Sequence, residues 1–378
     1  MAAKLVNGAT LSQVFNFDFS YEHKPLDAKK LAEARDKLSE LHLIIIDEMS
    51  MVSADMLYMI HLRLCEIFQS EDKFANIGIV LVGDLLQLPP IQGRYIFQEP
   101  KNVHFAPFYE VESLWHSFEV IDLKENHRQG DELTFSTVLN KMRVGIVDSD
   151  VEALLRTRLL DEQRNPSKLR RRLKNKVPIE NGKVEDLTTT NVFYTNEEVN
   201  IHNNKMLNLL STPLLEIEAN YPPKFKPKPT KNGTIAKKSQ FRHILTIKDG
   251  ARVMMIYNID TIDGLVNGSL GNIVGIEEKN GEVQYIIAKF DDGESGDRQR
   301  RKYPGLSAKY EGEKGTPIQK FEFDLPLSSS ARIKIKQFPL TMAWGITCHK
   351  MQGQTVKKGS KLIIHWHAKL KDGMAYVM

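Results

Sequence analysis

Cysteine is scarce in this chain. Its 378 residues include two cysteines, Cys65 and Cys348, far apart in the sequence. Two isolated cysteines exclude a disulfide framework, and they form none of the short cysteine spacings that bind zinc. We therefore expect the protein to work in a reducing compartment.

Long hydrophobic runs are missing as well. No apolar stretch is long enough to span a membrane, and the N-terminus lacks the basic start and apolar core of a secretory signal. Hydrophobic residues make up 41% of the chain and charged residues 26%, as in soluble globular proteins. These absences predict a protein that is not secreted and has no membrane partner.

A strong excess of one charge sign is also missing. The chain has 52 basic and 48 acidic residues, and the net charge of +4 does not by itself indicate a nucleic-acid partner. The basic residues are nevertheless concentrated in three segments, residues 168–176, 221–238 and 298–302. Each segment fits either a solvated loop or a contact with an anionic partner, and the first also fits a nuclear import signal.

Two apolar runs that end in polar residues are the most informative feature of the sequence. Residues 43–46 are followed directly by Asp47 and Glu48, and residues 77–82 are followed by a turn at 83–87. Runs of this kind are typical of buried strands in a parallel sheet. The segment between them has the apolar periodicity of a helix, which supplies the crossover. Both strands should therefore end at the same edge of one sheet.

The residues at this edge suit nucleotide chemistry. An aspartate such as Asp47 can hold Mg²⁺, a glutamate such as Glu48 can orient an attacking water, and a glutamine such as Gln87 can reach a γ-phosphate. The alternative for Asp47 and Glu48 alone is an ordinary polar strand end. The second strand and its glutamine favour the nucleotide site.

The chain as a whole is predicted to form two α/β lobes. Residues 1–145 form the first lobe, with a further strand expected at 118–123, and residues 146–244 and 338–378 form the second. Between the two parts of the second lobe, residues 245–337 contain short β segments separated by glycine turns, which is typical of a small barrel. The barrel is therefore predicted as an insertion in the second lobe.

The order of the motifs resembles that of the Pif-one-type DNA helicases, relatives of the RecD and Dda helicases in superfamily one. Asp47 and Glu48 match the family's Walker B element, and residues 83–90, GDLLQLPP, match its GDxxQLPP element. Arg128 and Gln129 resemble the next motif, whose arginine reaches the nucleotide as an arginine finger. The resemblance implies an α/β fold of two RecA-like parallel-sheet lobes, with a small SH3-like β-barrel inserted in the second.

A further stretch, residues 339–355, resembles the motif that couples DNA and nucleotide in the second lobe. Gly353 lies where the family's loop approaches the nucleotide. Met351 replaces the family's usual serine, which is expected to weaken one contact with the DNA backbone. Residues 2–11 resemble another motif, whose threonine contacts DNA. The resemblance thus implies DNA contacts at Thr10, Thr347, His349 and Lys350.

The resemblance also implies ATP and Mg²⁺ as cofactors. Asp47 is the expected metal ligand, and the expected nucleotide contacts are Asp47, Gln87, Arg128 and Gly353. The expected catalytic residues are Glu48, Gln87 and Arg128.

The family's phosphate-binding loop, GxxxxGK[ST], is missing from the chain. The N-terminus and the final residues 375–378 interrupt family motifs, and the first lobe lacks the strand that precedes the loop. We therefore expect a partial chain of a helicase. By itself it should hydrolyse almost no ATP, because the phosphate contacts are lost.

Two functions stay open. The first is an ATP-dependent 5′–3′ DNA helicase, present as part of its chain and acting as a monomer on single-stranded DNA or DNA junctions. The alternative is a non-hydrolysing nucleic-acid-binding remnant of a transposon-borne helicase. The intact Asp47, Glu48, Gln87 and Arg128 favour the first, and the missing loop favours the second. The resemblance implies DNA repair, recombination or telomere maintenance, in the nucleus or mitochondrion of a eukaryote.

Overall fold

The computed structural model of the chain describes a set of segments with gaps between them. They are residues 8–17, 23–91, 93–101, 113–125, 133–159, 189–223, 225–230, 233–235, 240–326, 332–352, 361–366 and 373–377. By its internal contacts the chain divides into two compact units. Unit 1 comprises Met1–Thr10 and Glu185–His367, and unit 2 comprises Leu11–Val184 and Ala368–Met378. The lobe boundaries predicted after residues 145, 244 and 337 stay predictions.

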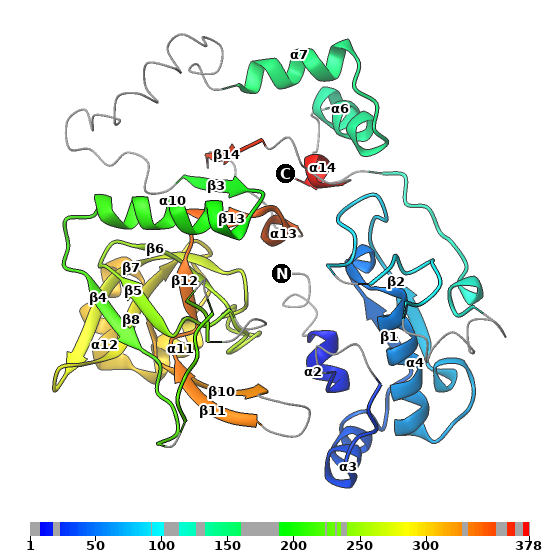
Figure 1. Cartoon of the computed structure of the whole chain (residues 1–378), viewed down its shortest axis with the longest axis horizontal. Helices are drawn as coiled ribbons and strands as arrows, with labels where there is room; N and C mark the ends of the chain where they lie inside the picture. The colour runs from blue at the N-terminus through cyan, green and yellow to red at the C-terminus, as the bar shows by residue number, and fades with distance from the viewer. Residues whose placement is uncertain are drawn as a thin grey trace. The chain divides into compact units, whose positions relative to one another are not determined.

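The centre of unit 2 is a parallel pair of strands, β1 (Leu43–Ile46) and β2 (Gly78–Leu81), shown in Figure 1. The two strands are paired in register over their whole length, so both end at the same edge. The helix α4 (Ala54–Phe68) lies between them in the chain and supplies the crossover. The predicted arrangement of strand, helix and strand is confirmed.

The helix α4 forms where the sequence combines an N-cap with an apolar stripe. Ser53 is the N-cap, and its Oγ accepts the N–H of Met56 at 3.1 Å. Leu57, Ile60 and Leu64 recur at helical spacing and are at most 1% exposed. Burial of such side chains stabilises the fold by roughly 1.5–3 kcal/mol each. This face of α4 therefore anchors the core of unit 2.

One face of the pair β1–β2 is open to solvent. Ile44 and Ile46 belong to the core that α4 also forms. Leu43 and Ile45 alternate with them along the strand and are 51% and 65% exposed. The prediction that these strands are buried is therefore wrong for the face that carries Leu43 and Ile45.

The described part of unit 2 also contains several shorter helices. They are α2 (Leu11–Phe15), α3 (Ala28–Lys37), η1 (Met49–Met51), η2 (Lys73–Asn76), η3 (Trp115–Ser117), α6 (Leu133–Arg143), α7 (Ser149–Arg158) and α14 (Met374–Val377). The strand predicted over residues 118–123 is wrong. These residues form no strand, and Val120, Ile121 and Leu123 are 83–85% exposed. A β-prone run remains irregular when no neighbouring strand pairs with it.

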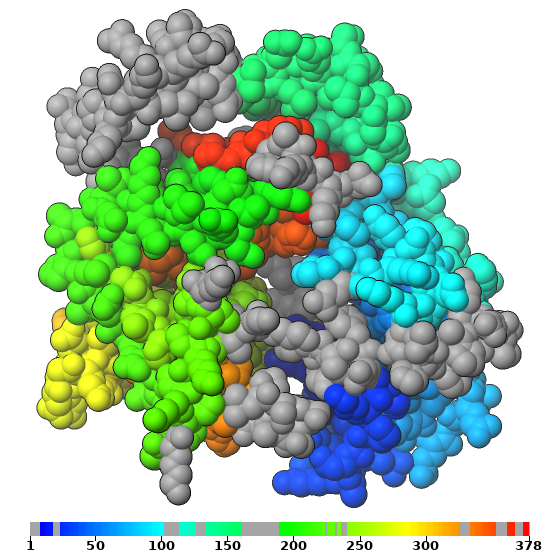
Figure 2. Space-filling model, in the orientation of Figure 1, coloured from blue at the N-terminus to red at the C-terminus, as the bar shows by residue number. Residues whose placement is uncertain are grey.

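Unit 1 contains a second parallel sheet, with the strand order β13 (Gly345–Thr347), β3 (Thr190–Phe193) and β14 (Leu362–Ile364). The helix α10 (Asn196–Leu209) follows β3 and packs beside this sheet in Figure 1. Its green atoms lie at the front surface in Figure 2. The second predicted parallel sheet is thereby confirmed.

A capping box starts α10 directly after β3. Thr195 Oγ1 accepts the N–H of Glu198 at 3.2 Å, and Glu198 Oε2 accepts the N–H of Thr195 at 2.9 Å. These two bonds satisfy backbone donors that a helix start leaves free. The turn from β3 into α10 is therefore defined by its local sequence.

The described strands between β3 and β13 in the chain are antiparallel. They are β4 (Leu215–Glu218), β5 (Ile244–Ile247), β6 (Arg252–Met255), β7 (Leu270–Lys279), β8 (Glu282–Phe290), β9 (Thr316–Ile318), β10 (Phe321–Pro326), β11 (Arg332–Gln337) and β12 (Leu340–Met342). Five of them form one sheet in the order β12-β6-β7-β8-β9, and β4–β5 and β10–β11 form separate pairs. The insertion is therefore built of β-strands as predicted, and its SH3-like closure stays a prediction.

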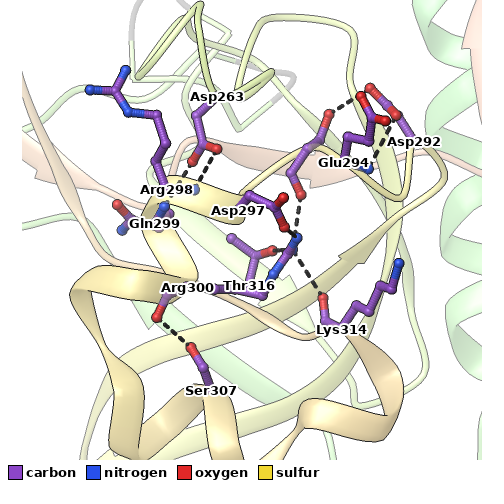
Figure 3. A network of polar contacts seen from close by, with 11 residues as sticks. Asp263, Asp292, Glu294, Asp297, Arg298, Gln299, Arg300, Ser307, Lys314 and Thr316 are labelled. Atoms are coloured by element: carbon purple, nitrogen blue, oxygen red, sulfur yellow. Dashed lines mark hydrogen bonds and ion pairs between the residues drawn. The ribbon is translucent and has the colours of Figure 1, made fainter.

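The basic segment at residues 298–302 is helical and partly structural. It lies in α11 (Asp297–Lys302), which precedes α12 (Pro304–Lys309) and η5 (Glu311–Glu313) between β8 and β9. Asp263 is 4% exposed and accepts the backbone N–H groups of Arg298 and Gln299 at 2.7 and 2.9 Å (Figure 3). This carboxylate caps the helix and complements its dipole.

The arginine in the middle of α11 points into the same polar network. Arg300 donates to the Ser295 carbonyl at 2.9 Å and to Thr316 Oγ1 at 2.7 Å, and it pairs with Asp297 (Figure 3). The segment is therefore a helix and not a loop, and Arg300 holds it against the strand β9. Arg298, Arg301 and Lys302 are exposed, as expected for a solvated segment.

Candidate nucleotide-binding and nucleic-acid-binding sites

Backbone hydrogen bonds join the ends of β1 and β2 in unit 2. The N–H of Val82 donates to the Ile46 carbonyl at 2.8 Å, and the N–H of Met49 donates to the Val82 carbonyl at 3.0 Å. Glu48 lies between these bonds with a left-handed backbone, φ 55° and ψ 46°. Its N–H donates to Asp47 Oδ1 at 2.9 Å. Asp47 and Glu48 are therefore fixed at the carboxyl edge of the sheet.

The turn after β2 approaches this edge closely at Gly83. Gly83 has φ +149°, and a Cβ atom there would lie 2.8 Å from the backbone nitrogen of Met49. Only glycine avoids both the strained backbone and this clash. Gly83, the first residue of the GDxxQLPP pattern, thus brings the turn at 84–87 next to Glu48.

Asp84 shapes the turn that carries Gln87. Its Oδ1 accepts the N–H of Leu86 at 3.0 Å, and its carbonyl accepts the N–H of Gln87 at 3.0 Å. Asp47, Glu48 and Gln87 are thus carried by the ends of two paired strands of one sheet. The structure brings these three predicted residues together, and their roles stay predictions.

Arg143, which sequence reasoning missed, also belongs to this edge. Arg143 Nε donates to Asp84 Oδ2 at 2.7 Å, and Nη2 donates to Oδ1 at 2.9 Å. The hydrogen bonds that Arg143 donates to Asp84 raise the pKa of Arg143. The two residues are separated by 59 positions, and no local pattern links them. Arg143 neutralises the charge of Asp84, so Asp84 is less suited than Asp47 to hold a cation at this edge.

The site suits Mg²⁺ held in the manner typical of phosphate enzymes. Within the described segments, no group of three or more His, Cys, Asp or Glu residues is placed to hold a metal ion by itself. Asp47 is exposed at the strand end. Mg²⁺ is commonly held by one or two carboxylates together with phosphate oxygens and water, which this arrangement fits.

Two predicted nucleotide contacts lie outside the described residues. Arg128 precedes α6, and Gly353 follows α13 (Cys348–Met351) in the chain. The roles of Arg128 and Gly353 therefore stay predictions.

Three of the predicted DNA contacts lie at the carboxyl end of β13 in unit 1. Thr347 ends β13, is 8% exposed and is the N-cap residue of α13. His349 and Lys350 lie on α13 and are partly buried. Burial, reinforced by the positive charge of Arg242, lowers the pKa of Lys350 to about 8. An anion that offsets this like-charge repulsion would be favoured here.

Thr10, the fourth predicted DNA contact, and Met351, which replaces the family's serine, differ in their burial. Thr10 is an exposed residue just before α2. Met351, which stands where the family usually has serine, is 8% exposed. Its side chain therefore contributes to packing in unit 1, and the predicted loss of a DNA-backbone contact stays a prediction.

A buried asparagine, also missed by sequence reasoning, positions β13. Asn203 on α10 accepts the N–H of Gly345 at 2.6 Å through Oδ1. Its Nδ2 donates to the carbonyls of Gly345 and Met342 at 3.0 and 3.1 Å. These bonds fix the start of the strand whose last residue is Thr347. A lone polar residue on a helix gave no signal of a partner about 140 positions away.

The part of the chain that the structure describes contains no helix of sufficient length and apolar character to cross a membrane.

Comparison with known proteins identifies the family. The family profile described as PIF1-like helicase matches residues 1–153, and the profile of the DNA helicase Pif1 2B domain matches residues 233–276. Together the two profiles cover more than half of the chain.

Curated relatives carry the same description. The chain is 27% identical to an ATP-dependent DNA helicase Pif1 of Psychrobacter sp. (strain PRwf-1), over 94% of the chain and 55% of the relative. It is 25% identical to the ATP-dependent DNA helicase PIF1 of Candida albicans, over 100% of the chain and 46% of the relative. The chain thus spans about half the length of these curated relatives.

Solved structures share the fold. The Pif1 helicase from Candida albicans aligns with a TM-score of 0.68 at 22% identity, over 100% of this chain and 78% of that structure. The Bacteroides Pif1 helicase in complex with ADP-AlF3 and single-stranded DNA aligns with a TM-score of 0.65 at 24% identity, over 100% and 77%. Both contain RecA-like α/β lobes. On the profiles, the relatives and the shared fold, this chain belongs to the PIF1-like helicase family.

Proposed function

We propose that this chain is part of an ATP-dependent DNA helicase that moves 5′–3′ along single-stranded DNA. The observation that carries the proposal is the convergence of Asp47, Glu48 and Gln87 at one edge of the sheet in unit 2. A carboxylate pair beside a glutamine turn suits the hydrolysis of a nucleoside triphosphate. Membership of the helicase family supports a DNA partner.

On the nucleotide side, we propose Mg²⁺ and ATP as cofactors. Asp47 would hold the metal, and Mg²⁺ would supply charge compensation for the phosphates when bound. Glu48 would hold the attacking water, and Gln87 would contact the γ-phosphate. Arg128 and Gly353 are proposed as further nucleotide contacts. A solved relative in complex with ADP-AlF3 supports nucleotide binding in this fold.

On the DNA side, we propose that Thr347, His349 and Lys350 contact the phosphate backbone of a single strand. Thr347 would donate its hydroxyl, and Lys350 would supply a positive charge that phosphate attracts. Thr10 is proposed as a further contact. Solved relatives bound to single-stranded and forked DNA support this class of partner.

An ATPase assay tests the nucleotide half of the proposal. The chain contains no GxxxxGK[ST] loop, so we expect almost no turnover from the purified chain with or without single-stranded DNA. The control is Glu48→Gln, which removes the proposed water-orienting carboxylate and should match the unmodified chain. DNA-stimulated turnover that disappears in Glu48→Gln would overturn the requirement for the loop and would support the role of Glu48.

A DNA-binding assay tests the other half. Removing the charge in Lys350→Gln should weaken binding to a labelled oligonucleotide and reduce its dependence on salt. The matched control is Lys279→Gln, because Lys279 is an exposed lysine at the end of β7, outside the proposed contact and outside the three basic segments. Equal losses in both variants would contradict a specific contact at Lys350.

A further inference from the structure

We infer that His365 and Trp366, directly after β14, form a stacking platform for a nucleobase of the single strand held at Thr347–Lys350. This inference rests on the proposed function, and it adds base contacts to a site proposed so far from backbone contacts alone. Aromatic rings that receive unpaired bases are a common means of holding single strands without reading their sequence.

The platform lies on the same sheet edge as the proposed backbone contacts. Thr347 on β13 pairs with Phe193 on β3, and Ile364 on β14 pairs with Val192. His365 is therefore level with Phe193 and Thr347 at the carboxyl ends of three parallel strands. In open α/β sheets this edge is where ligands bind.

The separation across the edge suits a single strand. Because β3 lies between β13 and β14, the ends of the outer strands are about 10 Å apart at the usual strand spacing of ~4.8 Å. Stacked nucleotides cover such a distance in roughly three steps of 3.4 Å, and an extended strand covers it in fewer. A strand that contacts Thr347 can thus place a nearby base on His365 or Trp366.

The histidine ring is supported from within the protein. The ring of His365 stacks on that of Phe193, with centroids 4.1 Å apart and planes at 11°. The ring of His202 lies on α10, 5.0 Å from Phe193. A Cβ atom at Gly345 would lie 2.9 Å from the Phe193 ring and 3.2 Å from that of His202. The supporting rings are therefore tightly packed, and His365 forms the exposed end of the stack.

A hydrogen bond fixes the orientation of this ring. His365 Nε2 lies 2.9 Å from Asn191 Oδ1, which is consistent with Nε2–H donating to the amide oxygen. The backbone N–H of His365 donates to the Val192 carbonyl at 2.9 Å. Burial lowers the pKa of His365, although Glu198 opposes this shift. The imidazole is thus favoured in its neutral form, which presents an aromatic face.

Trp366 extends the platform into solvent. Its side chain is 61% exposed, whereas Trp344 is fully buried and Trp115 is packed against the core of unit 2. An exposed indole that directly follows the supported ring of His365 in the chain offers a flat apolar surface, and Lys350 adds a positive charge on the same sheet edge. This combination suits a nucleic-acid single strand better than an apolar protein partner, which would gain nothing from the lysine.

The first test measures binding of the full chain to a fluorescent oligothymidine by anisotropy. Trp366→Ala should weaken binding about 5- to 150-fold, the range that corresponds to loss of one stacked base. Trp366→Phe keeps an aromatic ring and should lose much less affinity for the oligothymidine. The matched control is Ile262→Ala, because Ile262 is 62% exposed in the β insertion and should leave binding unchanged. Equal affinities of Trp366→Ala and the unmodified chain would overturn the platform.

The second test needs no protein variant. An oligonucleotide with abasic positions keeps its phosphates and loses its bases, so the unmodified chain should bind it more weakly, with an unchanged salt dependence. Equal binding of both oligonucleotides would overturn the inference and leave the proposed backbone contacts intact. No binding of either oligonucleotide at low salt would overturn the proposed function, and the inference with it.

Discussion

Arg143 donates two parallel hydrogen bonds to the carboxylate of Asp84, from Nε to Oδ2 at 2.7 Å and from Nη2 to Oδ1 at 2.9 Å. Asp84 begins the turn that presents Gln87, and Arg143 ends the helix α6. The ion pair therefore ties the turn at the candidate nucleotide site to a helix that follows much later in the chain.

This ion pair predicts energetic coupling between its partners. Bidentate pairs of arginine and carboxylate are stronger than ordinary surface pairs, but Arg143 is 39% exposed, so solvent reduces the effect. We expect Arg143→Ala and Asp84→Ala to show a coupling energy of about 0.5–1.5 kcal/mol in a double-mutant cycle measured by urea unfolding. Additive effects of the two substitutions would contradict a coupled pair.

Gly83 predicts a larger loss of stability. Alanine at this position would combine a strained backbone at φ +149° with a Cβ atom 2.8 Å from the Met49 nitrogen. We expect Gly83→Ala to lower the free energy of unfolding by roughly 2–4 kcal/mol. The matched control is Gly305→Ala, where the new Cβ would meet nothing within 4 Å. It should change stability little or raise it, and a similar loss in both variants would show that the turn does not require glycine.

We expect substitution of Asn203 to lower the stability of unit 1. Asn203→Ala removes the acceptor of the Gly345 N–H and the donor to two carbonyls, all of them at the start of β13. Leaving such buried groups without partners costs about 1–3 kcal/mol. The control Asn204→Ala changes an exposed asparagine on the same helix. In thermal unfolding, Asn203→Ala should melt at a lower temperature than Asn204→Ala. Equal melting temperatures would contradict the stabilising role of the Asn203 hydrogen bonds.

Lys350 predicts that DNA affinity depends on pH. The pKa of Lys350 in the folded chain is lowered to about 8, below its usual value of 10.5. The lysine is therefore charged below about pH 8, and its contribution to phosphate binding should be present at pH 7 and decline as pH rises through 8. A bound phosphate stabilises the charged form, which moves the decline to somewhat higher pH.

The control for this pH dependence is Lys350→Arg, which stays charged over the whole range. Its affinity for single-stranded DNA should change little between pH 7 and 9.5, whereas that of the unmodified chain should fall. Parallel curves for the two proteins would contradict the titration of Lys350.

The same lowered pKa predicts the sign of a stability change. Between about pH 8 and 10.5 the unfolded chain binds the Lys350 proton and the folded chain does not, so stability should rise with pH over this window. Lys350→Met removes the buried charge and should abolish this rise in urea unfolding. If stability still rises with pH in Lys350→Met, the rise must come from other titratable groups.

The candidate nucleotide site was largely predictable from the sequence because its signals are local. The apolar run before Asp47 and the glycine of GDxxQLPP are properties of short segments, and parallel strands bring their ends together. The full burial of both strands was not predictable, because exposure of Leu43 and Ile45 depends on what covers the sheet. The failed strand at residues 118–123 has the same origin, since a strand needs a partner.

Contacts between distant residues could not be predicted from a single sequence. Arg143 and Asp84, Asn203 and Gly345, and the stacked rings of Phe193 and His365 are each brought together by the tertiary fold. The helix α11 was missed for a related reason. Its N-terminus is capped by Asp263, which lies 35 residues earlier, so the local sequence shows only a basic run.

The measurement that tests the account most directly is the affinity of the purified chain for single-stranded DNA at a series of salt concentrations. The account predicts binding that weakens steadily with salt, with a linear relation between the logarithms of affinity and salt concentration. Lys350→Gln should reduce the slope by about 0.7, the value expected for one lost phosphate contact on a single strand. Absence of binding at low salt, or tight binding that salt does not change, would contradict it.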